Sequence, residues 1–288
     1  MSRIVPMLVV LCIYFLSVLP SHVDAKVLGY WMFDDKNKLG KDSSGLDNHG
    51  EPKKAAAHDG RGKVGGALKL DGLSWLEVPH DDSLTPKNQI TLMCWANFEG
   101  GALGESSEVS LIYKNGPFIL EGDQKDRRFW TSYSLAKLRP RKKLGSFIFE
   151  AQMTEGRVFT APGDKDHPEV NEWYHIAATA DGTKVRLYTN GVEKAVADQR
   201  GEFKPSEQVL TIGFDLRIPP DRGGSKPYHF GLIDEAIILD KALTADQVKE
   251  AMKFGDKGKS LEDFQVLFDV APQGKLAVKW GELKAGNK

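Results

Sequence analysis

Short apolar runs, separated by glycine, aspartate and asparagine, recur along most of the chain. The clearest series spans residues 173–196, where the turn dipeptides Asp181-Gly182 and Asn190-Gly191 separate three such runs. Apolar and polar residues alternate in the middle run, residues 183–189, as expected for a half-buried strand. Because Asp-Gly and Asn-Gly tolerate the positive φ of tight hairpin turns, the series predicts three consecutive antiparallel strands.

Similar runs, rich in aromatic and β-branched residues, predict further strands on either side of this series. They lie at residues 27–33, 67–70, 75–78, 90–98, 110–113, 117–120, 128–133, 145–150, 208–213 and 229–239. Residues 243–255 have a helical pattern instead, with Thr244 and Gln247 at capping-box spacing and Gly255 as the expected end. Many short strands followed by one short helix predict an all-β fold of two packed antiparallel sheets.

The first 25 residues differ in character from the rest of the chain. Arg3 precedes an almost wholly apolar stretch, residues 4–19, and residues 23–25 then resemble a cleavage site with small side chains. We therefore expect a signal peptide at residues 1–25 and a secreted or otherwise extracytoplasmic mature chain that begins at Lys26. The apolar stretch is short for a membrane span, and no span is expected after cleavage; an uncleaved anchor is the alternative.

A single folded domain is expected at residues 26–254, with a C-terminal extension at residues 255–288. Residues 255–260 are a polar hinge, and the apolar runs beyond them indicate either two extra strands or a docking tail. Cleavage of the signal peptide removes Cys12 and leaves Cys94 alone, so no internal disulfide is expected. Cys94 lies in a strand-like apolar run and is expected to pack as a small buried hydrophobic residue.

Charge is balanced along the chain, with 39 lysine and arginine residues against 40 acidic ones. Nucleic acid is not expected as a partner, because its binding requires a concentrated basic surface. The basic run at residues 139–143 is short and is interpreted as a solvated loop. The sequence contains no His-Glu-x-x-His, Cys-x-x-Cys, Gly-x-Ser-x-Gly or Walker motif, and therefore offers no support for a zinc site, a serine hydrolase or a nucleotide-binding protein.

Several phrases, taken in their order, resemble the laminin-G-like jelly-roll family, which is related to pentraxins and legume-type lectins. They lie at residues 31–34, 42–50, 70–72, 76–79, 90–95, 171–177, 187–191, 231–238 and 243–247. The resemblance covers residues 27–254, is poor at about 100–165, and does not extend to the tail. It implies a concanavalin A-like sandwich that binds a glycan or an extracellular protein, frequently with a calcium ion at the sheet rim. The same fold also serves adhesion modules and glycosidases, so function does not follow from it alone.

The resemblance implies calcium ligands at Asp42, Asn48 and Asp234, with backbone oxygens near Gly45 completing the shell. Calcium takes six to eight oxygen ligands in a flexible geometry, and this Gly-punctuated loop is rich in hard oxygen donors. The alternative is an Asx-turn loop in which Asp42 and Asn48 cap their own backbone. Asp47 stands where the family often has glycine, which adds charge to the loop.

A non-catalytic binding module is the expected function, with a glycosidase or a structural, adhesive protein as the alternatives. Retaining glycosidases need two carboxyl groups about 5 Å apart. The spaced acidic run of the laminarinase-like relatives is absent, and the adjacent Asp234 and Glu235 are expected to point to opposite faces of a strand. Trp130 and Tyr133 are the candidates for stacking on a sugar; packing in the core or at an edge is the alternative for both.

Overall fold

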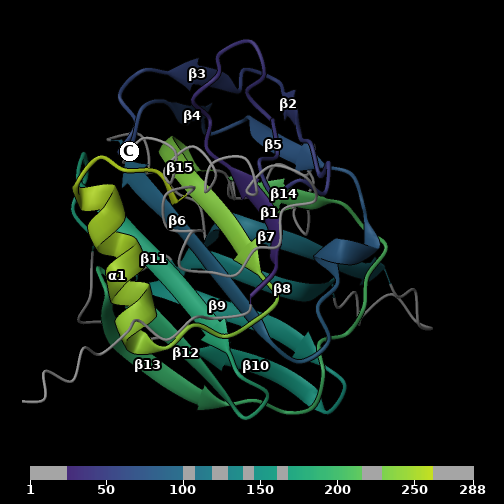
Figure 1. Cartoon of the computed structure of the whole chain (residues 1–288). Coiled ribbons are helices and arrows are strands. Elements are labelled where there is room, and N and C mark those ends of the chain that lie inside the picture. Colours follow the sequence, from purple (N-terminus) through teal and green to yellow (C-terminus); the bar gives the residue numbers. More distant parts are fainter. Residues whose placement is uncertain are drawn as a thin grey trace, which may run out of the picture.

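The computed structural model describes residues 25–99, 108–118, 129–138, 146–160, 168–215 and 229–261. Within these ranges two antiparallel sheets pack face to face, and one α-helix lies against the outside of the larger sheet (Figure 1). The predicted all-β jelly-roll sandwich with one short C-terminal helix is therefore confirmed. No helix in the described ranges is long and apolar enough to cross a membrane.

The larger sheet has eight strands. They run in the order β13 (Val192–Asp198), β12 (Lys184–Thr189), β11 (Trp173–Ala180), β6 (Ile90–Phe98), β15 (Phe230–Leu239), β4 (Ala67–Asp71) and β3 (Ala57–Asp59), and β1 (Val27–Trp31) pairs with β15. The three consecutive strands predicted from residues 173–196 are β11, β12 and β13, each hydrogen-bonded to the next. Local turn chemistry was sufficient to predict this part of the sheet.

The smaller sheet has seven strands. Their order is β10 (Gly156–Thr160), β9 (Phe147–Met153), β8 (Phe129–Leu138), β7 (Glu108–Phe118), β14 (Leu210–Ile212), β5 (Trp75–Val78) and β2 (Glu51–Lys53). The two separate strands predicted at residues 110–113 and 117–120 are one strand, β7. Its register against β8 shifts three times, and the last shift absorbs Gly116 and Pro117 without ending the strand.

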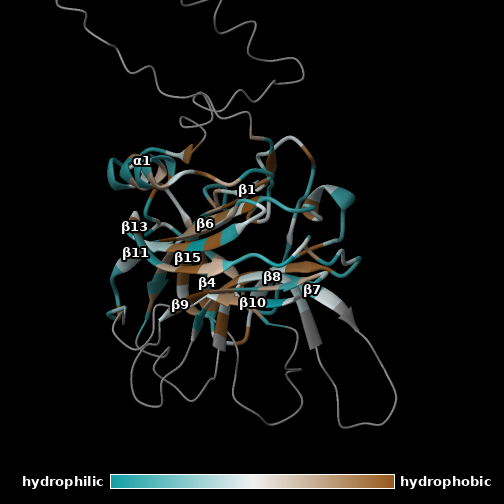
Figure 2. Cartoon of the chain, turned by 90° about the horizontal axis from the view of Figure 1, so that it is seen from below, coloured by the Kyte–Doolittle hydropathy of each residue, from teal (hydrophilic) through white to brown (hydrophobic). Residues whose placement is uncertain are grey.

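The main core lies between the two sheets and is built by alternation along the strands. In β6, Leu92, Cys94, Ala96 and Phe98 all point into this core. Cys94 is fully buried there, as predicted, and burial raises the pKa of its thiol. Figure 2 shows hydrophobic residues concentrated in the strands at the middle of the molecule, whereas α1 is largely hydrophilic on its outside.

The helix α1 (Ala245–Asp256) covers part of the outer face of the larger sheet. Its N-terminus has the predicted capping box, in which Thr244 and Gln247 satisfy each other's backbone N–H groups. Val248 and Ala251 pack in a second cluster that also contains Tyr30. A short 3₁₀ helix, η1 (Asp82–Leu84), follows β5.

The prediction that Gly255 ends the helix is wrong, because α1 continues through Gly255 to Asp256. Gly255 is buried in the last turn of α1, where a Cβ atom would lie 2.4 Å from Nε1 of Trp95. The helix ends one residue later, and Gly258 then takes a positive φ of 64°. The chain folds back from there onto the sandwich, where Leu261 is buried. The rest of the predicted extension lies outside the described residues.

Candidate functional site

The carboxylate of Asp42 holds the loop that follows β1 together. Its Oδ1 accepts hydrogen bonds from the backbone N–H groups of Tyr30 (2.8 Å) and Ser44 (2.9 Å). Its Oδ2 accepts from the hydroxyl of Ser44 (2.6 Å) and the N–H of Asn48 (2.9 Å). An ionised carboxylate has about four acceptor positions, and these donors occupy them. These hydrogen bonds are the ones that the loop-capping alternative predicts.

Asn48 joins the same loop to its neighbours. Its side-chain Nδ2 donates to the carbonyl oxygen of Leu28 (2.7 Å) and to Oγ of Ser83 (2.9 Å). The backbone carbonyl oxygen of Asn48 accepts a hydrogen bond from Nε1 of Trp31 (3.0 Å). Asn48 thus fastens the loop to β1 and η1, which is a structural role. Gly45, at the tip of the loop, takes a φ of 84° that favours glycine.

Asp234 is fully buried in β15. Its carboxyl group accepts hydrogen bonds from the N–H groups of Val64 (2.9 Å) and Glu235 (2.8 Å). Burial raises the pKa of Asp234 to about 9, and the nearby carboxylates of Glu235 and Asp34 act in the same direction. The raised pKa favours the neutral, protonated form of this carboxyl group.

The two acidic residues predicted as calcium ligands have different hydrogen-bond partners. Asp42 accepts from β1 and from its own loop, and Asp234 accepts from the N–H of Val64 ahead of β4. In the part of the chain that the structure describes, no group of three or more His, Cys, Asp or Glu side chains is placed to hold a metal ion. Calcium binding stays a prediction, and a thermal melt tests it below.

A β-bulge changes the expected orientation of Asp234 and Glu235. The register of β15 against β6 shifts between Asp234 and Ile237, so that Ile233 and Ala236, three residues apart, both point into the main core. The two acidic residues between them lie on the helix-bearing side, and the prediction of opposite faces is wrong. Glu235 accepts hydrogen bonds from the hydroxyl of Tyr30 and from the N–H of Leu261 (2.9 Å). Both carboxyl groups are buried, so neither can reach a substrate.

Tyr133 is a core residue, and the prediction that it contacts a ligand is wrong. It points into the main core from β8 and is fully buried. Its hydroxyl donates to the carbonyl oxygen of Leu84 (2.9 Å), and its ring packs edge-on against Phe203 at a centroid distance of 6.3 Å. Trp130 lies three residues earlier in β8, and its side chain is outside the described residues.

The outer face of the smaller sheet carries a pair of carboxylates that sequence spacing did not reveal. Glu51 in β2 lies opposite Glu77 in β5. Lys53 bridges them, with its Nζ 2.7 Å from Oε2 of Glu51 and 3.4 Å from Oε1 of Glu77. Beside them Trp75 packs against Phe214 at a ring-centroid distance of 4.7 Å. The pairing of β2 with β5 creates this arrangement, so residue spacing within either strand cannot show it.

This carboxylate pair does not have the electrostatics of a glycosidase site. The general acid of such an enzyme needs a raised pKa. The ammonium group of Lys53 instead lowers the pKa of Glu51, by a hydrogen bond and by its charge. Glu51 is also 73% exposed, so burial opposes this effect less than Lys53 produces it. The arrangement is that of a surface ion pair.

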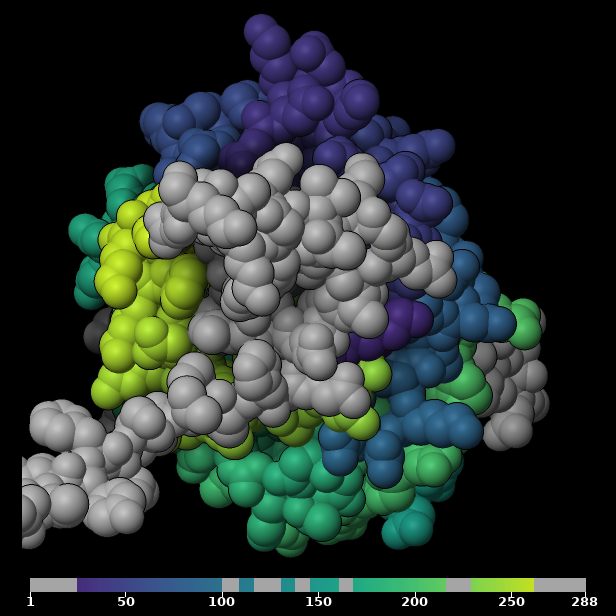
Figure 3. Space-filling view, in the orientation of Figure 1, coloured from purple at the N-terminus to yellow at the C-terminus, as the bar shows by residue number. Residues whose placement is uncertain are grey.

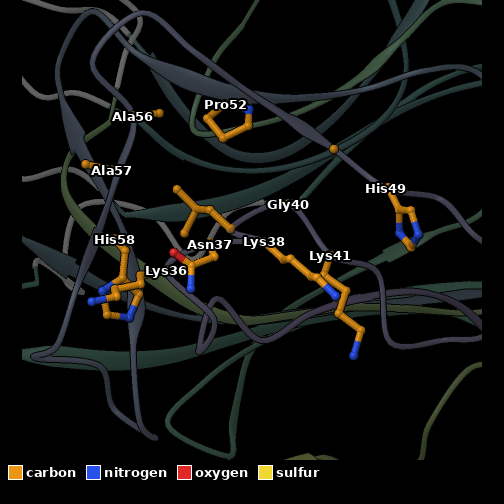
Figure 4. A pocket seen from close by; sticks show the side chains of 12 residues that line it. Lys36, Asn37, Lys38, Gly40, Lys41, His49, Pro52, Ala56, Ala57 and His58 are labelled. Atoms are coloured by element: carbon orange, nitrogen blue, oxygen red, sulfur yellow. The ribbon is translucent and has the colours of Figure 1, made fainter.

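A pocket of about 580 Å³ opens at the loop rim, between the segment after β1 and the segment that carries β2 and β3 (Figure 4). Its size is in the range of small-molecule sites, about 300–1,000 Å³. We call it the rim pocket. Its lining has six polar side chains, Lys36, Asn37, Lys38, Lys41, His49 and His58, around the apolar residues Leu39, Pro52, Ala56 and Ala57. In Figure 3 this early part of the chain (purple) forms the upper end of the molecule and faces solvent.

Two glycines bring the walls of the rim pocket together. The N–H of Gly50 donates to the carbonyl oxygen of Gly40 (2.7 Å), and a Cβ atom at Gly40 would lie 1.8 Å from the carbonyl oxygen of Gly50. Leu39 is buried in the main core beside this contact and anchors the wall. The close backbone approach therefore requires glycine at position 40, and this glycine is the sequence signal for the contact.

Fold and pocket together define a class of protein, a two-sheet antiparallel sandwich with a ligand-sized pocket at its loop rim. Residues 70–249 match the family model described as the concanavalin A-like lectin/glucanases superfamily. This is more than half of the chain, and the chain belongs to this family. Residues 36–58 of the rim pocket precede the matched range.

Solved structures with the same fold include domain 4 of AbnA, a GH43 extracellular arabinanase from Geobacillus stearothermophilus, in complex with arabinotriose. It has a TM-score of 0.57 and 22% identity, over 79% of this chain and 98% of that one. The binding domain of Paraclostridial Mosquitocidal Protein 1 has a TM-score of 0.58 and 15% identity, over 79% of this chain and 52% of that one.

The binding domain of botulinum neurotoxin serotype G has a TM-score of 0.52 and 14% identity, over 79% of this chain and 51% of that one. The chain thus spans about half the length of the two toxin binding domains. At these identities the likeness shows the fold alone. No curated protein matches the chain.

Proposed function

We propose that this chain is an extracytoplasmic, non-catalytic binding module that recognises carbohydrate at the rim pocket. The pocket is the observation that carries the proposal, because it is of ligand size and combines polar side chains with an apolar floor. The family and the binding domains among the similar structures support a recognition role. The pattern of residues 1–25 supports export.

A glycosidase is the second candidate, because Glu51 and Glu77 lie opposite each other on an outer sheet face. We place it second because Lys53 bridges the two carboxylates and lowers the pKa of Glu51. An extracellular protein remains the alternative ligand. The glycan-binding experiment is therefore run with and without calcium.

A glycan array probed with the purified protein, with and without calcium, tests the proposal. We expect binding to a subset of glycans, and we expect Ala57→Trp to abolish it, because an indole at this exposed lining position fills the pocket. The matched control is Val192→Trp, which adds the same ring at another exposed strand position, in β13. An array without any bound glycan, or equal loss in both variants, would overturn the proposal.

A further inference from the structure

The charge of the rim pocket is one-sided. Its lining contains three lysines and two histidines and no aspartate or glutamate. Figure 4 shows Lys36 and His58 at one end of the pocket and Lys38, Lys41 and His49 at the other, so basic side chains flank it on two sides. A ligand in the pocket would therefore meet positive charge at both of its ends.

No acidic side chain of the described chain forms an ion pair with the three lysines. Lysines elsewhere do form such pairs, for example Lys63 with Asp256 at 2.8 Å and Lys184 with Asp198. In the turn before the pocket, Asp35 uses its carboxylate to accept the N–H of Asn37 (2.9 Å). The charge of these exposed lysines is thus left to solvent or to a ligand.

Acidic residues near this segment also have partners other than the three lysines. Asp34 accepts the N–H of Gly66 at 2.7 Å, and Asp47 lies 3.7 Å from Nε2 of His49. Glu51 is paired with Lys53. Each of these carboxylates thus has a partner other than Lys36, Lys38 and Lys41, and none forms an ion pair with them.

The backbone of this segment directs the lysines outward. Turn hydrogen bonds join the N–H of Lys38 to the carbonyl oxygen of Asp35 (3.0 Å) and the N–H of Lys41 to that of Lys38 (2.9 Å). Leu39 takes the inward position and Gly40 is pressed against the opposite wall. The three lysines of this turn are exposed and line the rim pocket.

We propose that the rim pocket binds an anionic saccharide, one that carries carboxylate or sulfate groups. The inference rests on the proposed function and narrows its ligand class. Lysine ammonium groups bind such anions by charge-assisted hydrogen bonds. Pro52, Ala56 and Ala57 offer an apolar surface to the C–H face of a sugar ring. A neutral saccharide would leave the three ammonium groups without a partner.

Affinity electrophoresis against three polymers tests the inference. Polygalacturonate carries carboxylates, dextran sulfate carries sulfates, and dextran is neutral. We expect at least one anionic polymer to retard the protein, less so at high salt because exposed charges are screened, and we expect dextran to have no effect. The triple variant Lys36→Ala, Lys38→Ala, Lys41→Ala should bind that polymer about tenfold more weakly.

The matched control removes the same charge elsewhere, by Lys241→Ala, Lys249→Ala and Lys257→Ala at exposed positions around α1. It should leave the affinity within about twofold of the wild type. Equal losses in both triple variants would mean non-specific polyelectrolyte binding and would overturn the inference. Binding of neutral glycans alone, unaffected by the pocket lysines, would also overturn it and would leave the proposed function standing. Failure to bind any saccharide would overturn both.

Discussion

At the scale of single residues, Gly255 is a helix position where contact with Trp95 requires glycine. An alanine in a helix is ordinarily more stabilising than a glycine by about 1 kcal/mol. Here a Cβ atom would lie 2.4 Å from Nε1 of Trp95. We expect Gly255→Ala to lower the free energy of unfolding in urea by about 1–3 kcal/mol, because the contact has no space for a methyl group.

Gly60→Ala is the control for this experiment, because a Cβ atom at Gly60 meets open space. Its effect should stay within about 0.5 kcal/mol. A Gly255→Ala variant as stable as the wild type would show that α1 does not pack on Trp95 in this way.

His175 is a second residue whose environment has a measurable consequence. It is buried in β11, packs edge-on against Trp95 at a centroid distance of 5.2 Å, and has no hydrogen-bond partner for either ring nitrogen in the described structure. Burial lowers the pKa of His175 to about 4, whereas an unfolded chain protonates histidine near pH 6.5. Between these values the unfolded state binds the extra proton, so stability is lost as the pH falls.

We expect His175→Phe to reduce this loss between pH 6.5 and 4. One proton corresponds to a slope of about 1.4 kcal/mol per pH unit at most. Urea unfolding at several pH values measures the slope, and His229, whose pKa burial lowers to about 3, should keep part of the pH dependence in the variant. His49→Phe, at a side chain 55% exposed, controls for loss of an imidazole as such. An unchanged slope in His175→Phe would contradict the assignment.

At the scale of elements, the loop after β1 is stabilised by one carboxylate. Asp42→Ala removes the acceptor of three backbone N–H groups and is expected to lower the free energy of unfolding by about 2–4 kcal/mol. Asp71→Ala is the matched control. Asp71 caps a shorter turn at an exposed position, so Asp71→Ala should lower the free energy of unfolding by less than Asp42→Ala does.

The same variant decides the calcium prediction. Thermal melts of chelator-treated protein are recorded with and without millimolar calcium. We expect Asp42→Ala to lower the midpoint relative to the wild type by the same amount in both conditions, because the contacts that it loses are hydrogen bonds. A calcium-induced rise of the wild-type midpoint that Asp42→Ala abolishes would restore Asp42 as a ligand. A rise abolished by Asp234→Asn alone would place the ion at Asp234 without Asp42.

The start of β1 links to the loop after β15. The N–H of Lys26 donates to Oδ1 of Asp240 at 2.7 Å, and the N–H of Asp240 donates back to the carbonyl oxygen of Lys26 at 3.0 Å. Cleavage after Ala25 would turn the first donor into an ammonium group and strengthen this bond. In a chain that begins at Lys26, Asp240→Asn should then lower the free energy of unfolding by about 0.5–1 kcal/mol.

Residues added before Lys26 should make Asp240→Asn nearly neutral, since the ammonium group is then replaced by an amide. Urea unfolding of the two forms measures the difference. N-terminal sequencing of the exported protein gives the cleavage point directly, and a start elsewhere would contradict the expectation.

At the scale of the whole molecule, the arrangement of carboxylates predicts binding without turnover. Asp234 and Glu235 are buried, and Lys53 bridges Glu51 and Glu77. We expect the purified protein to release no reducing sugars from glucans or from any polymer that it binds. Turnover that is lost in Glu77→Gln and kept in Glu150→Gln, at a buried carboxylate paired with Arg157, would establish a glycosidase site at β2 and β5.

The sequence by itself was enough wherever neighbours along the chain set the structure. Asp181-Gly182 and Asn190-Gly191 predict the turns of β11, β12 and β13, because the conformation of a tight turn depends on its own residues. The capping box at Thr244 is likewise a contact between residues three positions apart. The apolar run that forms β6 was sufficient to predict that Cys94 is buried.

Tertiary structure alone decided the features that depend on distant partners. The face on which Tyr133 lies depends on the register shifts of β7 and β8, and the side on which Asp234 lies depends on a bulge against β6. One extra residue reverses the alternation of all that follow, and local pattern does not show where it is inserted. The rim pocket arises where the backbone at Gly40 meets that of Gly50. Its three lysines come from one segment, residues 36–41, and the pocket forms because this segment packs against residues 49–58, which no spacing within either segment encodes.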